Sequence, residues 1–207
     1  MRFSLERLKG GRVRLFADGE QFAIVTEGFL RTLNLKEGDE LTAEEIEDIL
    51  TEQSKAAALN KALRLITHRM HSRGELVEKL RREFPKEAAQ YAADEAESMG
   101  LVNDAEFSSL LAEELFLRKG FARRRIIDEL RSRGVSAEVA DSAVNISHED
   151  EQGRLKQLVE EISPERSADE KERRRLINNL LRKGYNLSDI NRALEYFGAE
   201  ADYNETD

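Results

Sequence analysis

The sequence predicts a mainly α-helical protein of three tandem three-helix repeats, which we expect to stack into an elongated, curved array after a small N-terminal module that contains a β-hairpin. Three observations predict this class. Apolar clusters return with a period of about fifty residues, strand-like alternation is confined to one short segment, and 36% of the 207 residues are charged while only 6% are aromatic. So little apolar material favours an extended array over a globule.

The N-terminal module is predicted from residues 12–26, where apolar and polar side chains alternate as in a half-buried strand. Asp18 and Gly19 lie in the middle of this segment and suit the positive φ angles of a tight hairpin turn. We find no other strand signal in the chain. Thr42 and Glu45 then have the spacing of a capping box, which satisfies backbone amides where a helix begins. That helix closes the module.

The rest of the chain is predicted to be helical, and its pattern recurs every fifty residues. Arg73, Arg123 and Arg173 occupy equivalent positions. Each is followed by three apolar residues that cover one side of a helix within about 100° of arc, which marks a side facing the core. The clusters are Leu76, Val77 and Leu80; Ile126, Ile127 and Leu130; and Leu176, Ile177 and Leu180. One such unit buries too little apolar area alone, so neighbouring units should share a core.

Caps and glycine breakers divide each repeat into three helices. In the first repeat the helices are expected over residues 56–67, 72–84 and 86–99. The second and third repeats follow the same order, with breaks at the Lys-Gly pairs 119–120 and 183–184. The domain limits predicted in this way are 1–52 for the hairpin module, 53–102, 103–150 and 151–198 for the three repeats, and 199–207 for a short acidic tail.

Several classes of protein are excluded by what the sequence lacks. Cysteine is absent, which excludes disulfides and thiolate metal clusters, and no catalytic or nucleotide-binding motif is found. His68, His71 and His148 lack the further ligands of a zinc site. We therefore predict no enzymatic activity, no metal site and no cofactor. Early charges at the N-terminus argue against a signal peptide, and no apolar run approaches the roughly 18 residues of a membrane helix, so a cytoplasmic protein is expected.

The net charge of −9 hides three basic segments. Residues 61–82, 118–133 and 171–183 each carry a net charge of +5, which leaves −24 on the remainder of the chain. Such segregation creates a local positive surface on an acidic protein.

Two interpretations of Arg73, Arg123 and Arg173 stay open. An arginine near a helix N-terminus opposes the helix dipole, which disfavours a purely local stabilising role. Each arginine could contact an anionic partner, or it could form an ion pair with an acidic helix of a neighbouring repeat. Further arginines lie outside the apolar clusters. Runs of this kind usually indicate a solvated face, but because these arginines recur with the repeat, they could align into one stripe that binds an extended anionic partner. They are Arg81, Arg82, Arg124, Arg125, Arg131, Arg174, Arg175 and Arg182.

Four stretches of sequence resemble the RecX family of recombinase regulators. They are residues 69–80, 99–107, 119–120 and 127–135, and together they cover most of residues 57–145. The motif combines spacing, caps and a Gly-Leu-x-x-Asp junction, although His71 stands where the family more often has Arg or Pro. The motif residues with expected structural roles are Arg69, Ser72, Glu75, Leu76, Leu80, Gly100, Asp104, Phe107, Gly120, Leu130 and Gly134. The third repeat matches more weakly, and the hairpin module resembles an extension that some members carry.

The resemblance implies a crescent of three-helix units that docks into the helical groove of the RecA filament on single-stranded DNA. Members of the family typically restrain RecA, hindering filament extension, ATP turnover, strand exchange and stimulated repressor cleavage. A monomer without catalytic activity is expected, and the arginines named above are its candidate contacts. The competing hypothesis is a module that grips nucleic-acid phosphates directly, and an enzyme with an unrecognised site is a remote third. The acidic background favours the first hypothesis, with which weak DNA binding is compatible.

Overall fold

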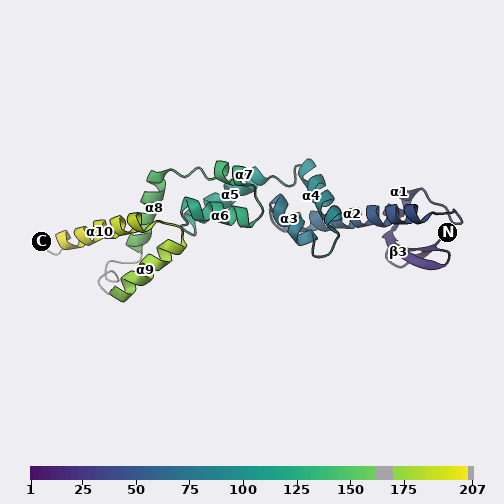
Figure 1. Cartoon of the computed structure of the whole chain (residues 1–207), viewed down its shortest axis with the longest axis horizontal. Helices are drawn as coiled ribbons and strands as arrows, with labels where there is room; N and C mark the ends of the chain where they lie inside the picture. Colours follow the sequence, from purple (N-terminus) through teal and green to yellow (C-terminus); the bar gives the residue numbers. More distant parts are fainter. Residues whose placement is uncertain (162–169, 205–207) are drawn as a thin grey trace. The chain divides into compact units, whose positions relative to one another are not determined.

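The computed structural model describes residues 1–161 and 170–204, and the side chains through residue 196. The chain forms two compact units, Met1–Val102 and Asn103–Asp207 (Figure 1). Helices dominate both units, and strands occur only near the N-terminus of the part so described. The mainly helical class with a small N-terminal sheet is therefore confirmed.

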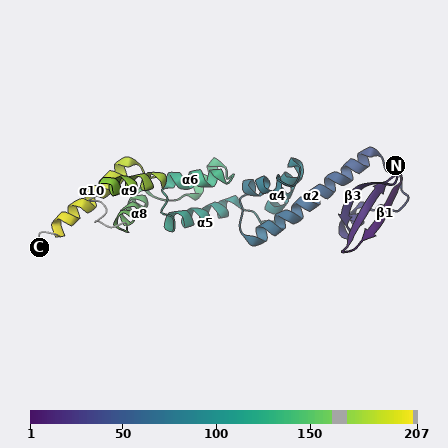
Figure 2. The ribbon, with the colours of Figure 1, turned by 90° about the horizontal axis from the view of Figure 1, so that it is seen from below.

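The first unit begins with an antiparallel sheet of three strands in the order β1-β2-β3 (Figure 2). The strands are β1 (Phe3–Leu8), β2 (Arg12–Ala17) and β3 (Glu20–Thr26). The predicted hairpin joins β2 to β3, with positive φ at both Asp18 and Gly19. The prediction that residues 12–26 hold the only strands is wrong, because β1 pairs with β2 along its whole length. Phe3 and Leu5 alternate with polar residues over too short a run to indicate a strand without that partner.

The sheet packs on two helices, α1 (Glu27–Leu33) and α2 (Ala43–His68). Alternate sheet residues turn inward and form a core with Leu30 of α1 and Ile49 of α2. The predicted capping box at the start of α2 is present in both directions, between Thr42 and Glu45. The buried sheet residues of this core are Phe3, Val13, Leu15, Ala23 and Val25.

Helix α2 continues without a break for 26 residues. The helix predicted over residues 56–67 is therefore the second half of a longer helix that begins at Ala43. No glycine or proline occurs between residues 43 and 68, so nothing in the sequence ends the first half. Its N-terminal half packs on the sheet, whereas Ala58 and Ala62 of its C-terminal half belong to the next core.

That next core is shared by α2, α3 (Arg73–Leu80) and α4 (Lys86–Ser98). Leu76 and Leu80 of α3 are fully buried in it. The side of α4 that faces this core consists of alanines, whose small side chains let α2 and α4 lie close together. They are Ala88, Ala89, Ala92, Ala93 and Ala96. Gly100 then takes a positive φ of 70° after the end of α4.

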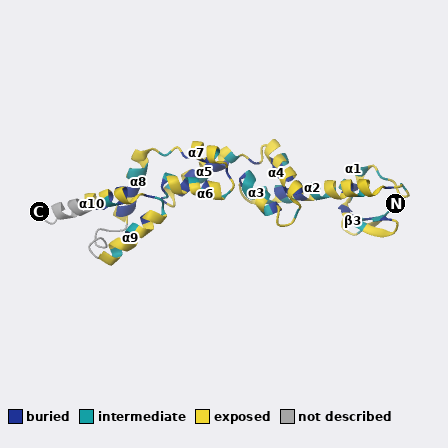
Figure 3. Ribbon diagram, in the orientation of Figure 1, coloured by how far each residue is buried: buried dark blue, intermediate teal, exposed yellow. Residues whose placement is uncertain are grey.

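The second unit contains two further groups of three helices. The first group is α5 (Asp104–Leu117), α6 (Arg123–Ser132) and α7 (Ala137–Ala143). The second group is α8 (His148–Glu161), α9 (Glu170–Arg182) and α10 (Leu187–Asn204). Each group has its own buried cluster, and Figure 3 shows buried residues along the inner sides of these helices. Residues 199–204 of the predicted tail continue α10, and residues 205–207 lie outside the described residues.

The second and third repeats are joined by their Lys-Gly breaks. The backbone amide of Ala122 donates to the carbonyl of Lys183 at 2.9 Å, and the Lys183 ammonium donates to the carbonyl of Lys119. Ala122 itself is buried in the cluster of the third repeat. The expectation that these two neighbours share core contacts is met at this junction. Across residues 1–161 and 170–204, no helix has the length and apolar character needed to cross a bilayer.

Candidate partner-binding surface

Helix α6 concentrates positive charge at its first turn. It begins after Ala122, whose methyl group cannot cap the helix, and its first three residues are arginines. Ile126 and Leu130 are buried on one side of α6, and Arg124 and Arg125 are exposed. No acidic residue lies in this turn, so the arginine charges and the positive end of the helix dipole act together.

Glu151 of α8 offsets part of this charge. Its carboxylate is half-buried and lies close enough to the backbone amide of Arg123 for that amide to lower its pKa. Burial has the largest effect and raises the pKa of Glu151 above its ordinary value. The nearby Asp189 also raises this pKa, whereas the Arg123 amide lowers it. The third repeat thus supplies a carboxylate to the start of a helix in the second repeat.

Arg73 and Arg123 form ion pairs within their own repeats. The Arg73 Nε lies 3.0 Å from the Asp94 Oδ1 and 3.5 Å from the Glu97 Oε2, both on α4. The Arg123 guanidinium lies 3.3 Å from both the carbonyl and the Oδ1 of Asp141 on α7. These printed contacts lie within a repeat, and both interpretations of the arginines, an anionic partner or a bridge to a neighbouring repeat, stay predictions. Both side chains are more than a third exposed, so each ion pair contributes between about 0 and 1 kcal/mol.

Arg173 lacks the carboxylate that its two counterparts have. Asp141 follows Arg123 by 18 residues, and the same step from Arg173 leads to Asn191, which cannot form an ion pair. Arg173 is exposed, and no ion pair joins it to another residue that the structure describes. The three arginines are thus equivalent in sequence position, but within the described residues an acidic partner of this kind is found only for Arg73 and Arg123.

The other predicted arginines divide into paired and unpaired side chains. Four of them pair with a glutamate three or four residues away: Arg82 with Glu78, Arg125 with Glu129, Arg174 with Glu170, and Arg175 with Glu172. Among the arginines predicted to bind a partner, those that are exposed and have no ion-pair partner within residues 1–161 and 170–196 are Arg81, Arg124, Arg131, Arg173 and Arg182. Unpaired guanidinium groups keep their charge and their donors for an external anion.

The structure brings predicted arginines of two repeats to one hollow. Arg124 and Arg125 of α6 and Arg182 of α9 line a depression of about 430 Å³, which we call the arginine hollow. Asp128 is the acidic residue of this lining, so the lining contains three arginines and one carboxylate. A second hollow, of about 480 Å³, adjoins it and shares Arg124 with it.

Tyr185 lines both hollows and was missed by the sequence analysis. It is 3% exposed, and its hydroxyl has no hydrogen-bond partner among the residues described. Burial raises the pKa of Tyr185 far above its ordinary value, and Glu151 adds to this effect. The equivalent residue of the second repeat is Val135, directly after Gly134. A tyrosine in place of that buried valine was the signal available in the sequence.

The motif residues hold local structure rather than form a pocket. The Ser72 hydroxyl accepts a hydrogen bond from the Glu75 amide at 3.0 Å and caps α3, and Arg69 forms an ion pair with the Glu75 carboxylate. Burial alone would raise the pKa of Glu75, but the hydrogen bond and charge of Arg69 hold it below its ordinary value. Asp104 begins α5. The buried apolar members are Leu76, Leu80, Phe107 and Leu130, and those with positive φ are Gly100, Gly120 and Gly134.

The histidines do not form a metal site in this structure. His71 is buried, and its ring contacts the Arg69 carbonyl and the Lys79 ammonium. Among the described residues, no group of three side chains of the kinds that ligate metals lies together.

Comparison with known proteins places all three repeats in one family. Family models match residues 58–95, 103–144 and 149–194 as the first, second and third three-helix domains of RecX. The chain is 36% identical to the regulatory protein RecX of Streptomyces coelicolor over 73% of this chain and 83% of that one. It is 29% identical to the protein of the same name from Caldanaerobacter subterraneus over 92% and 95%. A crystal structure of a regulatory protein RecX shares the fold, with a TM-score of 0.66 and 20% identity over 94% of this chain and 98% of that one.

Proposed function

The chain belongs to the RecX family of regulatory proteins, and from this we propose that it binds the RecA filament on single-stranded DNA and restrains the recombinase, ATPase and coprotease activities of RecA. It acts by binding, with no reaction and no cofactor of its own. The arginine hollow is the proposed centre of the contact. Matches to all three three-helix domains of the family support the proposal that the chain is a regulator of this kind.

The observation that carries the proposal is the convergence of Arg124, Arg125 and Arg182. Two of these three guanidinium groups, those of Arg124 and Arg182, have no ion-pair partner among the residues described. They come from different repeats, yet they line the same hollow. A solvated basic face needs no such convergence, whereas recognition of an anionic group by several donors does.

The hollow suits a carboxylate or phosphate of the filament. A guanidinium group offers donors in a planar fork that matches two oxygens of either anion. The first turn of α6 adds its dipole in the same direction. The long-range attraction between this surface and the filament should weaken as salt is added, because exposed charges are screened.

A second function, direct binding of nucleic acid without RecA, is favoured by the same unpaired arginines. The net charge of −9 opposes it, because phosphate binding depends on an excess of Lys and Arg. The two functions differ in their need for RecA. Affinity for naked single-stranded DNA that falls steeply with salt, together with unchanged RecA ATPase, would support the second function.

The test replaces Arg124 and Arg182 by glutamate in the full chain and measures RecA ATPase on single-stranded DNA. We expect the concentration needed for half-inhibition to rise by at least about tenfold, which corresponds to about 1.4 kcal/mol. The matched control is Lys9→Glu with Lys36→Glu, which makes the same change of charge at exposed residues of the first unit. Equal inhibition by all three proteins would remove the arginine hollow from the mechanism. No inhibition by the unaltered chain would contradict the proposed function itself.

A further inference from the structure

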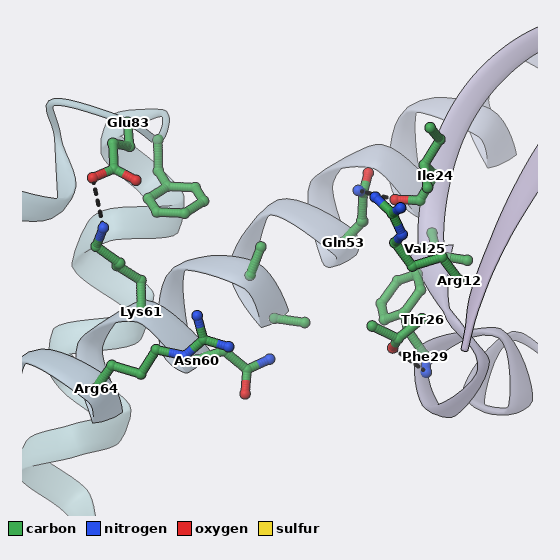
Figure 4. Close-up of a pocket in the computed structure, with 13 residues that line it drawn as sticks. Arg12, Ile24, Val25, Thr26, Phe29, Gln53, Asn60, Lys61, Arg64 and Glu83 are labelled. Carbon is green, nitrogen blue, oxygen red and sulfur yellow. Dashed lines mark hydrogen bonds and ion pairs between the residues drawn. The ribbon is translucent and has the colours of Figure 1, made fainter. Parts of the chain in front are cut away.

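A groove runs beside the middle of α2, within the first unit (Figure 4). It has a volume of about 420 Å³. Ile24, Val25 and Phe29 line it from the sheet and α1, and Phe84 lines it from the turn between α3 and α4. The α2 residues between these walls include Ala56 and Ala57. The groove is thus mainly apolar, and none of the three arginines of the arginine hollow lines it.

The two walls of the groove are held in place by side chains at its ends. The Gln53 amide donates to the backbone carbonyl of Ile24 at 2.9 Å and ties the edge strand β3 to α2. The Lys61 ammonium lies 2.8 Å from the Glu83 carboxylate and ties α2 to the opposite wall. Between these two attachments α2 carries alanines, whose methyl groups leave the groove unfilled. A preformed groove of this kind costs a ligand little reorganisation.

Two cations in the groove are available to a ligand. Arg12 of β2 and Arg64 of α2 line it and are exposed. Neither has an ion-pair or hydrogen-bond partner for its guanidinium group in the described part of the chain. Lys61, by contrast, is already paired with Glu83. The groove therefore combines an apolar surface with two free positive charges and favours an apolar ligand that carries negative charge.

We propose that this groove binds a segment of a partner protein in which aliphatic side chains are flanked by carboxylates. The aliphatic groups would cover Ile24 and Ala57, and the carboxylates would pair with Arg12 and Arg64. The source of the segment rests on the proposed function: it belongs to the protein subunits of the filament. The groove is then a second contact, formed by the N-terminal module together with the first repeat.

A nucleic acid fits this groove less well than such a segment. The aliphatic lining offers few partners for the polar edges of a base, because the Gln53 amide is already engaged and burying an unpaired polar group is unfavourable. The two rings, Phe29 and Phe84, each pack against the core of their own wall, which leaves only part of each ring for stacking. Two free cations are also few for a row of phosphates.

The absence of cysteine from the chain permits a direct test with a single attachment point. Asn60→Cys places a thiol at an exposed residue of the groove, where a photoactivatable benzophenone maleimide is attached. Glu47→Cys is the matched control, since it is exposed on the same helix outside the groove. The full chain is irradiated with RecA filaments on labelled single-stranded DNA. We expect Asn60→Cys to cross-link to RecA protein at least about fivefold more than Glu47→Cys.

Affinity provides a second measurement that does not depend on cross-linking. Ala57→Trp fills the groove from an exposed position, and Ala57→Ser is its control. Arg64→Glu reverses one free charge at the surface without touching a core. We expect Ala57→Trp and Arg64→Glu each to weaken filament binding about tenfold, while Ala57→Ser binds as the unaltered chain does. Unchanged circular dichroism spectra establish that the variants fold.

The outcomes separate this inference from the proposed function. If the unaltered chain binds the filament but both groove variants bind equally well, the groove inference is overturned and the proposed function stands. Cross-linking of Asn60→Cys to the DNA strand would overturn it in favour of a nucleic-acid site. If the unaltered chain fails to bind the filament, both are overturned.

Discussion

Gly184 lies so close to Arg125 that a β-carbon on the glycine would be 2.6 Å from the Cβ of the arginine and 3.1 Å from its backbone nitrogen. Gly184 belongs to the loop between α9 and α10, and Arg125 lies in the first turn of α6. The glycine also has a positive φ of 98°. This contact fixes the edge of the arginine hollow, because it sets how closely the third repeat approaches the charged turn of the second.

Gly184→Ala should destabilise the second unit. The added methyl group meets a backbone atom, which cannot move aside, and the positive φ is unfavourable for alanine. We expect the free energy of unfolding to fall by about 2 kcal/mol or more, measured by urea denaturation with circular dichroism. Gly153→Ala in α8 is the matched control, since its β-carbon meets nothing within 4 Å. Helix propensity should make that control neutral or up to about 1 kcal/mol more stable. A Gly184→Ala protein as stable as the control would contradict the close packing.

Acidification should destabilise the first unit through His71. This buried ring donates from Nδ1 to the Arg69 carbonyl at 2.8 Å, and its Nε2 accepts from the Lys79 ammonium at 3.1 Å. Burial, the largest cause, lowers the pKa of His71 below its ordinary value of 6.5, and the charges of Arg69 and Lys79 act in the same direction. The unfolded chain therefore takes up the proton more readily. The contribution to stability is complete above about pH 6.5 and is lost as the pH falls toward the pKa of the folded state.

The measurement is the midpoint of thermal unfolding between pH 7.5 and 5.5. His71→Gln should flatten the decline of this midpoint with falling pH, because the glutamine carries no titrating group. His68→Gln removes an exposed histidine from the end of α2 and should leave the decline unchanged. Identical curves for His71→Gln and the unaltered chain would show that another group causes the decline.

The ion pairs of Arg73 and Arg123 should contribute little to stability. We expect Arg73→Gln and Arg123→Gln each to lower the free energy of unfolding by less than about 1 kcal/mol, because both pairs are solvent-exposed. Arg173→Gln should change it by less than about 0.5 kcal/mol, since Arg173 forms no ion pair with a residue that the structure describes. Chemical denaturation of the three variants gives these values. A cost of several kcal/mol at Arg73 or Arg123 would instead assign them a mainly structural role.

Much of the helical fold could be predicted because its signals are local. The capping box of Thr42 and Glu45 and the buried Leu76 and Leu80 follow from caps and periodicity alone. Strand β1 could not be predicted in this way, because its stability comes from pairing with β2. The continuity of α2 was missed for a different reason. One helix there serves two cores, so its apolar residues change sides partway along.

The candidate site was only partly predictable, because it depends on contacts between segments far apart in the sequence. A period of fifty residues indicates which arginines are equivalent, but not which carboxylate lies near each. Asp94 and Asp141 lie 21 and 18 residues after their arginines, so the pairs do not share a spacing. The convergence of Arg124 with Arg182 depends on how two repeats pack, and no single repeat contains that information.

Tyr185→Phe should raise stability and weaken binding together. The Tyr185 hydroxyl is buried, and no described residue forms a hydrogen bond with it, so the folded state bears the cost of its lost hydration. Removing it should raise the free energy of unfolding by about 1 kcal/mol. If the arginine hollow receives a carboxylate or phosphate, the same hydroxyl is a donor beside that anion, and its loss should weaken filament binding by about threefold or more.

The control is Tyr91→Phe, at an exposed tyrosine of α4, which should change neither quantity. Urea denaturation and filament affinity at fixed salt measure the two effects. A gain in stability with unchanged affinity would mean that Tyr185 only packs the junction between the repeats. A gain in stability together with weaker filament binding would place Tyr185 in contact with the partner.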